Sequence, residues 1–299
     1  MLDIFLKVIL PVFVVVGIGA GYHRWRDVSA QVPAQITVYL LTPALIFNSL
    51  LSTNVPAQAS IKVAGASLIT SAAIVAGTLL LGKLLRQPRA TRSAFVLVSA
   101  FPNSGNLALP VILLAYGDAA LSFAVIIFVV LALYAWSVGV FIASSSEMGG
   151  LASLRQVFKM PHVYAVAFAF LVKASGWTLP VAVESPLELL GNAAIPMMLL
   201  VLGFQIGRGL TVTDLPSLVV AIGVRLIGAA GLAYGMTLAF GLDGVEQRVV
   251  IVMAAMPTAI FTTIVATQFR ANPQFVTAGV VGGTLASLVT LTGLLALLD

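Results

Sequence analysis

The stretch that decides the fold is FPNSGNLALP, residues 101–110, in the middle of an apolar window at residues 92–115. Two prolines, a glycine, two asparagines and a serine interrupt what would otherwise be an uninterrupted membrane-spanning helix. Each proline removes a backbone donor and clashes with the carbonyl four residues earlier. Irregular backbone within a membrane survives only inside protein or beside a cavity. We therefore expect a discontinuous helix whose half-helix end directs N–H groups and a partial positive charge inward.

The composition around this stretch is that of a membrane protein. Of the 299 residues, 60% are hydrophobic and only 8% are charged, and the mean hydropathy is +1.11. A soluble domain carries about 25% charged residues. So few charges could not cover the surface of a water-soluble globule, so we expect the surface to lie in a lipid bilayer.

A spanning helix needs about 20 mainly apolar residues. Ten windows of this kind can be marked in the sequence: 4–22, 33–51, 61–82, 92–115, 119–143, 161–177, 186–207, 215–240, 247–269 and 274–298. The first window is too long for the core of a signal peptide and is expected to span the membrane.

The basic residues predict the orientation of these spans, because cytoplasmic loops carry the excess of Lys and Arg. The joints after windows 1, 3, 5, 7 and 9 hold ten of them: Arg24, Arg26, Lys83, Arg86, Arg89, Arg92, Arg155, Lys159, Arg208 and Arg270. The opposite side holds four: Lys7, Lys62, Lys173 and Arg248. Both termini should therefore face away from the cytoplasm, in a bacterial inner (plasma) membrane. Basic residues scattered singly at helix ends do not form a nucleic-acid site, despite a net charge of +5.

The prolines suggest an internal duplication. Three pairs stand at separations of 155, 153 and 150 positions: Pro102 with Pro257, Pro43 with Pro196, and Pro11 with Pro161. Five spans per half would make the second copy enter from the opposite side, which is the inverted-topology repeat of many secondary transporters. The prediction is an all-α membrane protein of ten helices, with repeats at residues 1–143 and 161–299 joined by a cytoplasmic linker at 144–160.

The second half is interrupted at the corresponding place, in MPTA at residues 256–259. Paired interrupted spans are the best sequence pointer to a transporter site. The alternative is a pair of packing kinks, in which glycine allows close approach and amides join neighbouring helices. We favour the site and assign substrate binding to eight residues: Pro102, Asn103, Ser104, Gly105, Asn106, Pro257, Thr258 and Thr262.

Three further residues are candidates for the same role. Arg225 lies about ten residues into the window at 215–240, and an ionisable residue at that depth usually faces a partner or an aqueous cavity. It could attract an anionic substrate or hold a moving bundle; equally, its side chain could extend to the cytoplasmic headgroups. Ser52 and Asn54 follow the window at 33–51 and are placed less securely.

Several chemistries are missing from the sequence. There are no cysteines, and no Asp or Glu lies deep in any window. Neither a Walker phosphate loop, a HExxH metal pair nor a GxSxG elbow is present. We therefore predict no catalytic residues, no metal site and no cofactor.

Four motifs resemble the auxin efflux carrier family, which includes plant PIN-FORMED carriers and bacterial malonate and malate carriers. They are LTPALIF at 41–47, PNSGNLALP at 102–110, LLVLGFQ at 199–205 and AAMPTA at 254–259. The likeness covers nearly the whole chain, which is similar to the compact bacterial members. It implies a ten-helix fold related to the bile-acid/sodium symporters, with helices 4 and 9 crossing near the midplane. In that fold helices 1, 2, 6 and 7 form a scaffold and the others a moving core, which gives elevator-like exchange of an organic anion.

The expected function is therefore secondary transport of a small carboxylate across the bilayer. The coupling ion, proton or sodium, stays open, as do uniport and a homodimeric state. One alternative is a sodium-coupled symporter in which the same amides hold sodium. Another is a membrane receptor that binds a metabolite without moving it.

Overall fold

The computed structural model describes residues 1–52, 55–84, 88–144, 161–207, 212 and 214–298. This part of the chain is helical and contains no strand, only one isolated bridge between two extended residues. Seven of its helices are long and apolar enough to cross a membrane: Leu2–Arg26, Gln31–Ser52, Ala57–Leu84, Ala108–Ser144, Val181–Ile206, Leu215–Ala239 and Pro273–Leu298. The chain is a multi-pass, all-α membrane protein.

The elements of the first half, in chain order, are α1 (Leu2–Ile4), η1 (Phe5–Ile9), α2 (Leu10–Arg26), α3 (Gln31–Ile36), η2 (Thr37–Leu41), α4 (Thr42–Ser52), α5 (Ala57–Leu84), α6 (Arg89–Ala100), α7 (Ala108–Tyr134), η3 (Ala135–Gly139) and α8 (Val140–Ser144). The second half has α10 (Pro161–Ser175), α11 (Val181–Ile206), α12 (Leu215–Gly223), η4 (Val224–Gly228), α13 (Ala229–Ala239), α14 (Gly244–Ala254), α15 (Phe261–Gln268) and α16 (Pro273–Leu298). The four η elements are single π-helical turns inside longer helices.

The difference between ten predicted windows and seven long helices has a physical explanation. The windows at 92–115 and 247–269 are each divided by an interrupted segment, so that neither forms one long helix. The window at 161–177 forms a helix of only 15 residues, α10. The ten-span topology stays a prediction, and the predicted linker lies, except for Ser144, outside the described residues.

The predicted windows at 92–115 and 119–143 meet at Gly117. This residue has φ 76° and ψ −170°, a left-handed conformation that glycine alone adopts at no steric cost. The backbone is not helical at this residue, so α7 consists of two helices that meet at a kink. The sequence predicted a joint between 115 and 119, and the glycine forms it.

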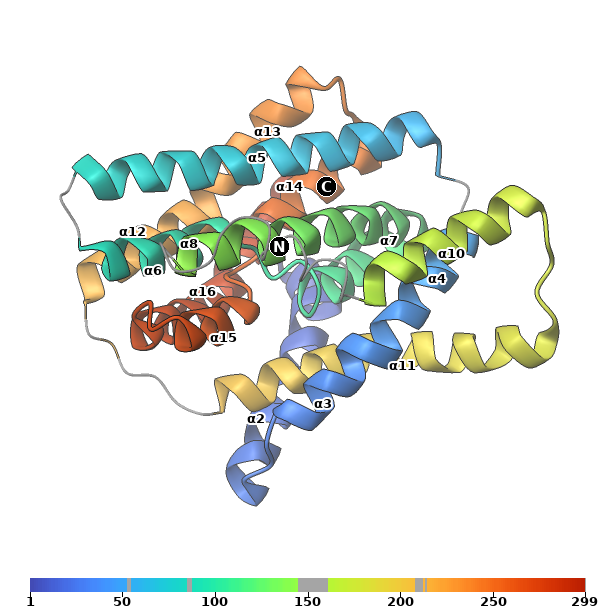
Figure 1. Cartoon of the computed structure of the whole chain (residues 1–299), viewed down its shortest axis with the longest axis horizontal. Helices are drawn as coiled ribbons and strands as arrows, with labels where there is room; N and C mark the ends of the chain where they lie inside the picture. Colours follow the sequence, from blue (N-terminus) through green and yellow to red (C-terminus); the bar gives the residue numbers. More distant parts are fainter. Residues whose placement is uncertain (53–54, 85–87, 145–160, 208–211, 213, 299) are drawn as a thin grey trace.

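The helices pack in two groups. The first helix group consists of α2, α3, α4, α10 and α11, which lie together at the bottom and right of Figure 1 and contact one another. The second helix group consists of α5 to α8 and α12 to α16, in which α5 packs on α6, α7 and α13, and α16 packs on α6 and α15. The resemblance to the auxin efflux carrier family implies such a division, in which the first two helices of each half are separate from the others.

Close backbone approach holds the first helix group together. A Cβ atom placed on Gly19 of α2 would lie 2.6 Å from the carbonyl oxygen of Leu200 and 3.2 Å from the Cα of Gly203, both in α11. Small residues at such contacts let helix backbones meet in a membrane, where the hydrophobic effect does not drive helices together. The exposed Gly17, on another face of α2, has no atom within 4 Å of its added Cβ.

This contact predicts a difference between two glycine-to-alanine variants of one helix. Gly19→Ala should lower the thermal unfolding temperature in detergent, because overpacking costs about 1–3 kcal/mol. Gly17→Ala should unfold at or slightly above the wild-type temperature, since alanine is the better helix former. Tryptophan fluorescence on heating measures both. Equal unfolding temperatures for the two variants would contradict the close α2–α11 contact.

Candidate functional site

The two interrupted segments cross and pair with each other. The backbone N–H of Asn103 donates to the carbonyl of Pro257 at 2.7 Å, and the N–H of Ala259 donates to the carbonyl of Phe101 at 2.8 Å. Each proline lacks an N–H of its own, so its neighbours supply the donors. The crossing is therefore fixed by reciprocal backbone hydrogen bonds between segments more than 150 positions apart in the chain.

Thr258 strengthens the crossing with its side chain. It lies opposite Pro102 in an antiparallel bridge and is completely buried. Its hydroxyl donates to the carbonyl of Val98 at 2.8 Å, in the last turn of α6. Carbonyls at the end of a helix have no partner within that helix, and this hydroxyl supplies one.

Arg225, in η4, satisfies the ends of both interrupted helices. Its guanidinium donates to the carbonyl of Ser99 at 3.2 Å, in α6, and to the carbonyl of Ala254, the last residue of α14. The side chain is 2% exposed, so it does not extend to the headgroups. A cation is favourable at a helix C-terminus, where the helix dipole is negative. One buried charge therefore compensates two helix ends at the crossing.

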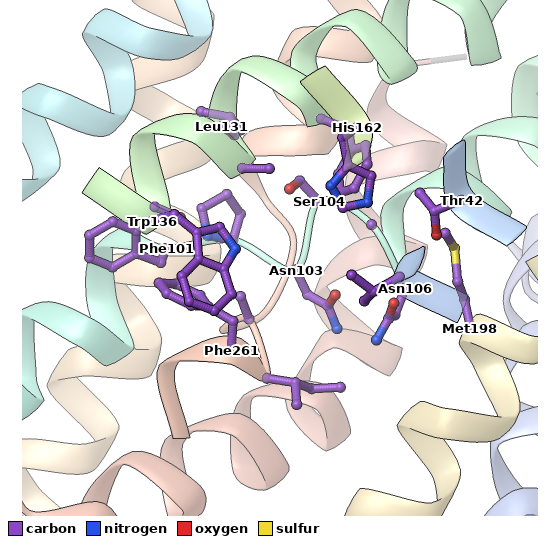
Figure 2. A pocket seen from close by; sticks show the side chains of 18 of the residues that line it. Thr42, Phe101, Asn103, Ser104, Asn106, Leu131, Trp136, His162, Met198 and Phe261 are labelled. Carbon is purple, nitrogen blue, oxygen red and sulfur yellow. The ribbon is translucent and has the colours of Figure 1, made fainter. Parts of the chain in front are cut away.

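A cavity of about 200 Å³ lies beside the crossing, between the two helix groups (Figure 2). The interrupted segment of the first half lines it from Phe101 to Asn106, and the second contributes Ala259 and Ile260. The first helix group adds Ala34, Thr37, Val38, Thr42, His162, Met198, Val201 and Gln205. Figure 2 shows the amides of Asn103 and Asn106 in the space between these walls.

Three polar atoms of the cavity wall are buried without a hydrogen-bond partner. They are Nδ2 of Asn103, Nδ1 of His162 and Oε1 of Gln205. Most buried polar side-chain atoms in proteins are hydrogen-bonded, and an unpaired one costs free energy. The cavity therefore offers both donors and acceptors that a polar ligand could satisfy.

Aromatic rings form the opposite wall of the cavity. The rings of Phe101 and Phe261 meet edge to face with centroids 5.9 Å apart, and the ring of Trp136 lies 5.4 Å from that of Phe261. Figure 2 shows these three rings together on one side of the amides. A mainly apolar cavity with a few converging polar groups is typical of a small-molecule site.

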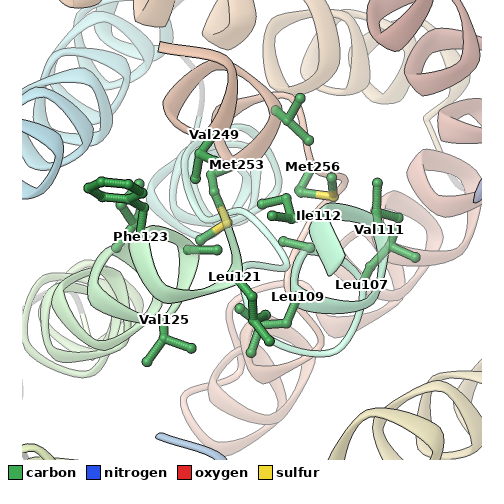
Figure 3. Close-up of a cluster of buried hydrophobic side chains, with 14 of the residues drawn as sticks. Leu107, Leu109, Val111, Ile112, Leu121, Phe123, Val125, Val249, Met253 and Met256 are labelled. Carbon is green, nitrogen blue, oxygen red and sulfur yellow. The ribbon is translucent and has the colours of Figure 1, made fainter. Parts of the chain in front are cut away.

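Behind the crossing, buried apolar side chains of α7 and α14 pack tightly. Figure 3 shows Ile112 of α7 near Met256, which follows α14, and Leu121 of α7 near Met253 of α14. This cluster fixes the start of α7 relative to the end of α14. The irregular backbone is thus supported by close packing on the side away from the cavity.

Gly105 allows a close contact on the cavity side of the interrupted segment. A Cβ atom on it would lie 2.8 Å from the ring of Phe128, in α7. The glycine of the asparagine–glycine run therefore allows the interrupted segment to reach the helix that follows it.

Ser52 lies elsewhere. It lines a second cavity, of about 860 Å³, together with Asp118, Glu184, Glu188 and Asn192. The structure therefore separates it from the crossing, and Asn54 lies outside the described residues.

The eleven predicted site residues thus fall into distinct places. Pro102, Asn103, Ser104, Gly105 and Asn106 line the cavity at the crossing. Pro257, Thr258 and Thr262 are buried beside it, where the hydroxyl of Thr262 donates to the carbonyl of Ala259 at 2.6 Å. Arg225 lies behind Pro102, beside a space of about 10 Å³.

Sequence reasoning missed several residues of the cavity wall. His162 stands next to a predicted membrane boundary, and Gln205 ends a predicted helix, so both look solvated in the sequence. Thr37 and Trp136 lie in the π-helical turns η2 and η3, which no sequence motif predicts. A polar residue among apolar ones at a helix end was the available signal, and it does not distinguish a cavity from the headgroup region.

The chain is similar to known membrane transport proteins. Residues 4–295 match the family described as "Membrane transport protein". The chain is 22% identical over 264 residues to an "Uncharacterized transporter" of Methanothermobacter thermautotrophicus, which covers 86% of this chain and 85% of the relative. It is also 25% identical over 140 residues to "Auxin efflux carrier component 3a" of Oryza sativa subsp. japonica, over 45% of this chain. The latter match spans about a quarter (23%) of the rice protein's length.

The contacts of Arg225 predict the effect of removing its charge. Arg225→Met should lower the unfolding temperature strongly, because each buried carbonyl left unpaired costs about 1–3 kcal/mol. The unfolding temperature of Arg225→Lys should lie between those of the wild type and Arg225→Met, because an ammonium group lacks the fork of N–H donors that reaches two acceptors. Arg89→Met, at the exposed start of α6, is the matched control. If Arg225→Met were as stable as that control, the two carbonyl contacts would not hold the crossing.

Proposed function

Since the chain belongs to the membrane transport protein family, we propose that it is a secondary transporter that moves a small organic anion, a carboxylate, across the membrane. The family consists of transporters rather than enzymes, and its match confirms the resemblance to auxin efflux carriers. The observation that carries the proposal is the cavity at the crossing, where the amide of Asn103 is buried without a partner.

The proposed membrane topology has ten spans in two inverted repeats. In it, α6 and the start of α7 form one interrupted span, and α14 with α15 forms its counterpart in the second half. The pairing of the two interrupted segments supports this correspondence, because each segment donates one backbone N–H to a carbonyl of the other. The basic residues in the joints support an orientation with both termini on the non-cytoplasmic side of the plasma membrane.

The proposed binding site uses amides and helix ends rather than a fixed charge. Asn103 and Asn106 donate to the carboxylate, and Ser104 adds a hydroxyl. The helices that begin after each interruption, α7 and α15, direct the positive ends of their dipoles to the same region. Discontinuous helices bind anionic groups of substrates in this way in other transporters.

The proposed movement is an elevator-type exchange between the two helix groups. The cavity is lined by both groups, so that a displacement of one against the other would open it to alternate sides. The first helix group, locked by the Gly19–Leu200 approach, would be the scaffold. The second helix group carries the crossing and would move with the substrate.

Asparagine variants in the two cavities test the site. In proteoliposomes, Asn103→Ala and Asn106→Ala should each raise the KM for uptake about tenfold, since a hydrogen bond to a charged group contributes roughly 1.5 kcal/mol. Asn192→Ala, in the wall of the second cavity, is the matched control and should leave KM unchanged. Uptake is measured with radiolabelled acetate, malonate, malate and the auxin indole-3-acetate.

Two results would count against the proposal. Wild-type uptake of none of the four carboxylates, beside empty liposomes, would reject an organic-anion carrier. A KM raised by Asn192→Ala but not by the other two variants would move the substrate to the second cavity.

A further inference from the structure

We propose that His162 takes up a proton when an anion enters the cavity, so that this carrier couples each carboxylate to one proton. The inference rests on the proposed function and adds the coupling ion to it. His162 is the second residue of α10, and its side chain is 6% exposed. Figure 2 shows the ring pointing from α10 toward the interrupted segment that carries Ser104 and Asn106.

The imidazole ring of His162 is packed against another ring, but one of its nitrogens has no hydrogen-bond partner. It meets the ring of Phe128 edge to face, with centroids 5.5 Å apart and planes at 83°. Its Nδ1 atom is buried and has no hydrogen-bond partner. The ring belongs to the cavity wall, and an unpaired polar atom there costs free energy that a ligand would relieve.

The charge of the cavity wall makes this ring important. Among the described residues, no Lys or Arg lines the cavity, and the one other titratable side chain on its wall is Tyr134. An anion transferred from water into such a mainly apolar space is costly unless an opposite charge accompanies it. In water, imidazole is the side chain whose charge changes between about pH 5 and 8. An anion beside a buried imidazole favours its charged form. His162 can therefore supply the missing charge, and the amides of Asn103 and Asn106 cannot.

The charged groups of the neighbouring elements do not face His162. The described part of α4, against which α10 packs, contains no titratable residue. Asp118 of α7 and Glu184 and Glu188 of α11 line the second cavity. Lys173, at the other end of α10, donates to the carbonyl of Leu50. Arg225 is engaged with helix ends behind Pro102, so its charge is already compensated.

The proposed cycle balances one proton against one carboxylate. A carboxylate enters the open cavity, and His162 binds a proton from water there, forming an imidazolium that donates to the anion. Because α10 belongs to the first helix group, the imidazolium stays in place while the second helix group moves and opens the cavity to the other side. For a monocarboxylate, the pair of anion and imidazolium in the cavity is neutral during this movement. On the other side the carboxylate leaves, the imidazolium releases its proton to water, and the ring is neutral again. No covalent bond to carbon forms or breaks.

The test uses the chain's two histidines as a matched pair. His162→Gln keeps a polar side chain of similar reach that does not titrate. His23→Gln is the control, because His23 lies in the last turn of α2, outside the cavity, where its Nδ1 is 2.7 Å from the carbonyl oxygen of Val28. Uptake of radiolabelled malonate and indole-3-acetate is measured against pH in proteoliposomes that contain a pH-sensitive dye.

Wild type and His23→Gln should move about one proton per carboxylate, and their KM should rise about tenfold per pH unit above the titration of the imidazole. His162→Gln should show no proton movement with the substrate and a KM that no longer follows pH. Titration of the substrate itself would persist in His162→Gln, so it is distinguished from titration of the ring.

Calorimetry on the wild type keeps the test independent of the variant's folding. Malonate binding in two buffers of different ionisation enthalpy gives the protons taken up per anion bound. Uptake of carboxylate without protons in both assays would overturn the role of His162 and leave the proposed carrier intact. Proton-linked binding without any transport would support His162 but reject the carrier.

Discussion

Every backbone N–H and C=O at the middle of a membrane must find a partner within the protein, and this constraint shapes the crossing. Two interrupted segments leave helix ends without intrahelical partners. Each segment supplies the other with donors at 2.7 and 2.8 Å, and Thr258 takes one further carbonyl. Neither interruption could be buried alone, so the two halves of the chain depend on each other at this point.

The crossing also separates the C-terminal ends of helices from the N-terminal ends. The helices that end there, α6 and α14, present their negative dipole ends to Arg225. The helices that begin there, α7 and α15, start next to Asn106 and Ile260, which line the cavity. A single buried guanidinium thus compensates the helix C-termini, and in the proposed function the helix N-termini attract the anion. This division explains how a chain without deep carboxylates can hold a buried arginine.

The sequence predicted the membrane class, the interruptions and the family from local features. Composition indicates lipid as the solvent, and FPNSGNLALP indicates a break, because proline chemistry acts within a few residues. The five residues from Pro102 to Asn106 that line the cavity were predicted from this run. Arg225 was recognised as unusual for the same kind of reason, since its charge stands in an apolar window.

The roles of these residues were decided by contacts between distant segments, which no local pattern contains. Arg225 donates to Ser99 and Ala254, 126 and 29 positions away. His162 appears in the sequence as a boundary residue, and only the packing of α10 beside the crossing buries it in the cavity wall. The sequence alone determined where the helices break and that lipid is their solvent. The tertiary structure decided which polar atoms remain unpaired, because pairing depends on neighbours that only folding brings together.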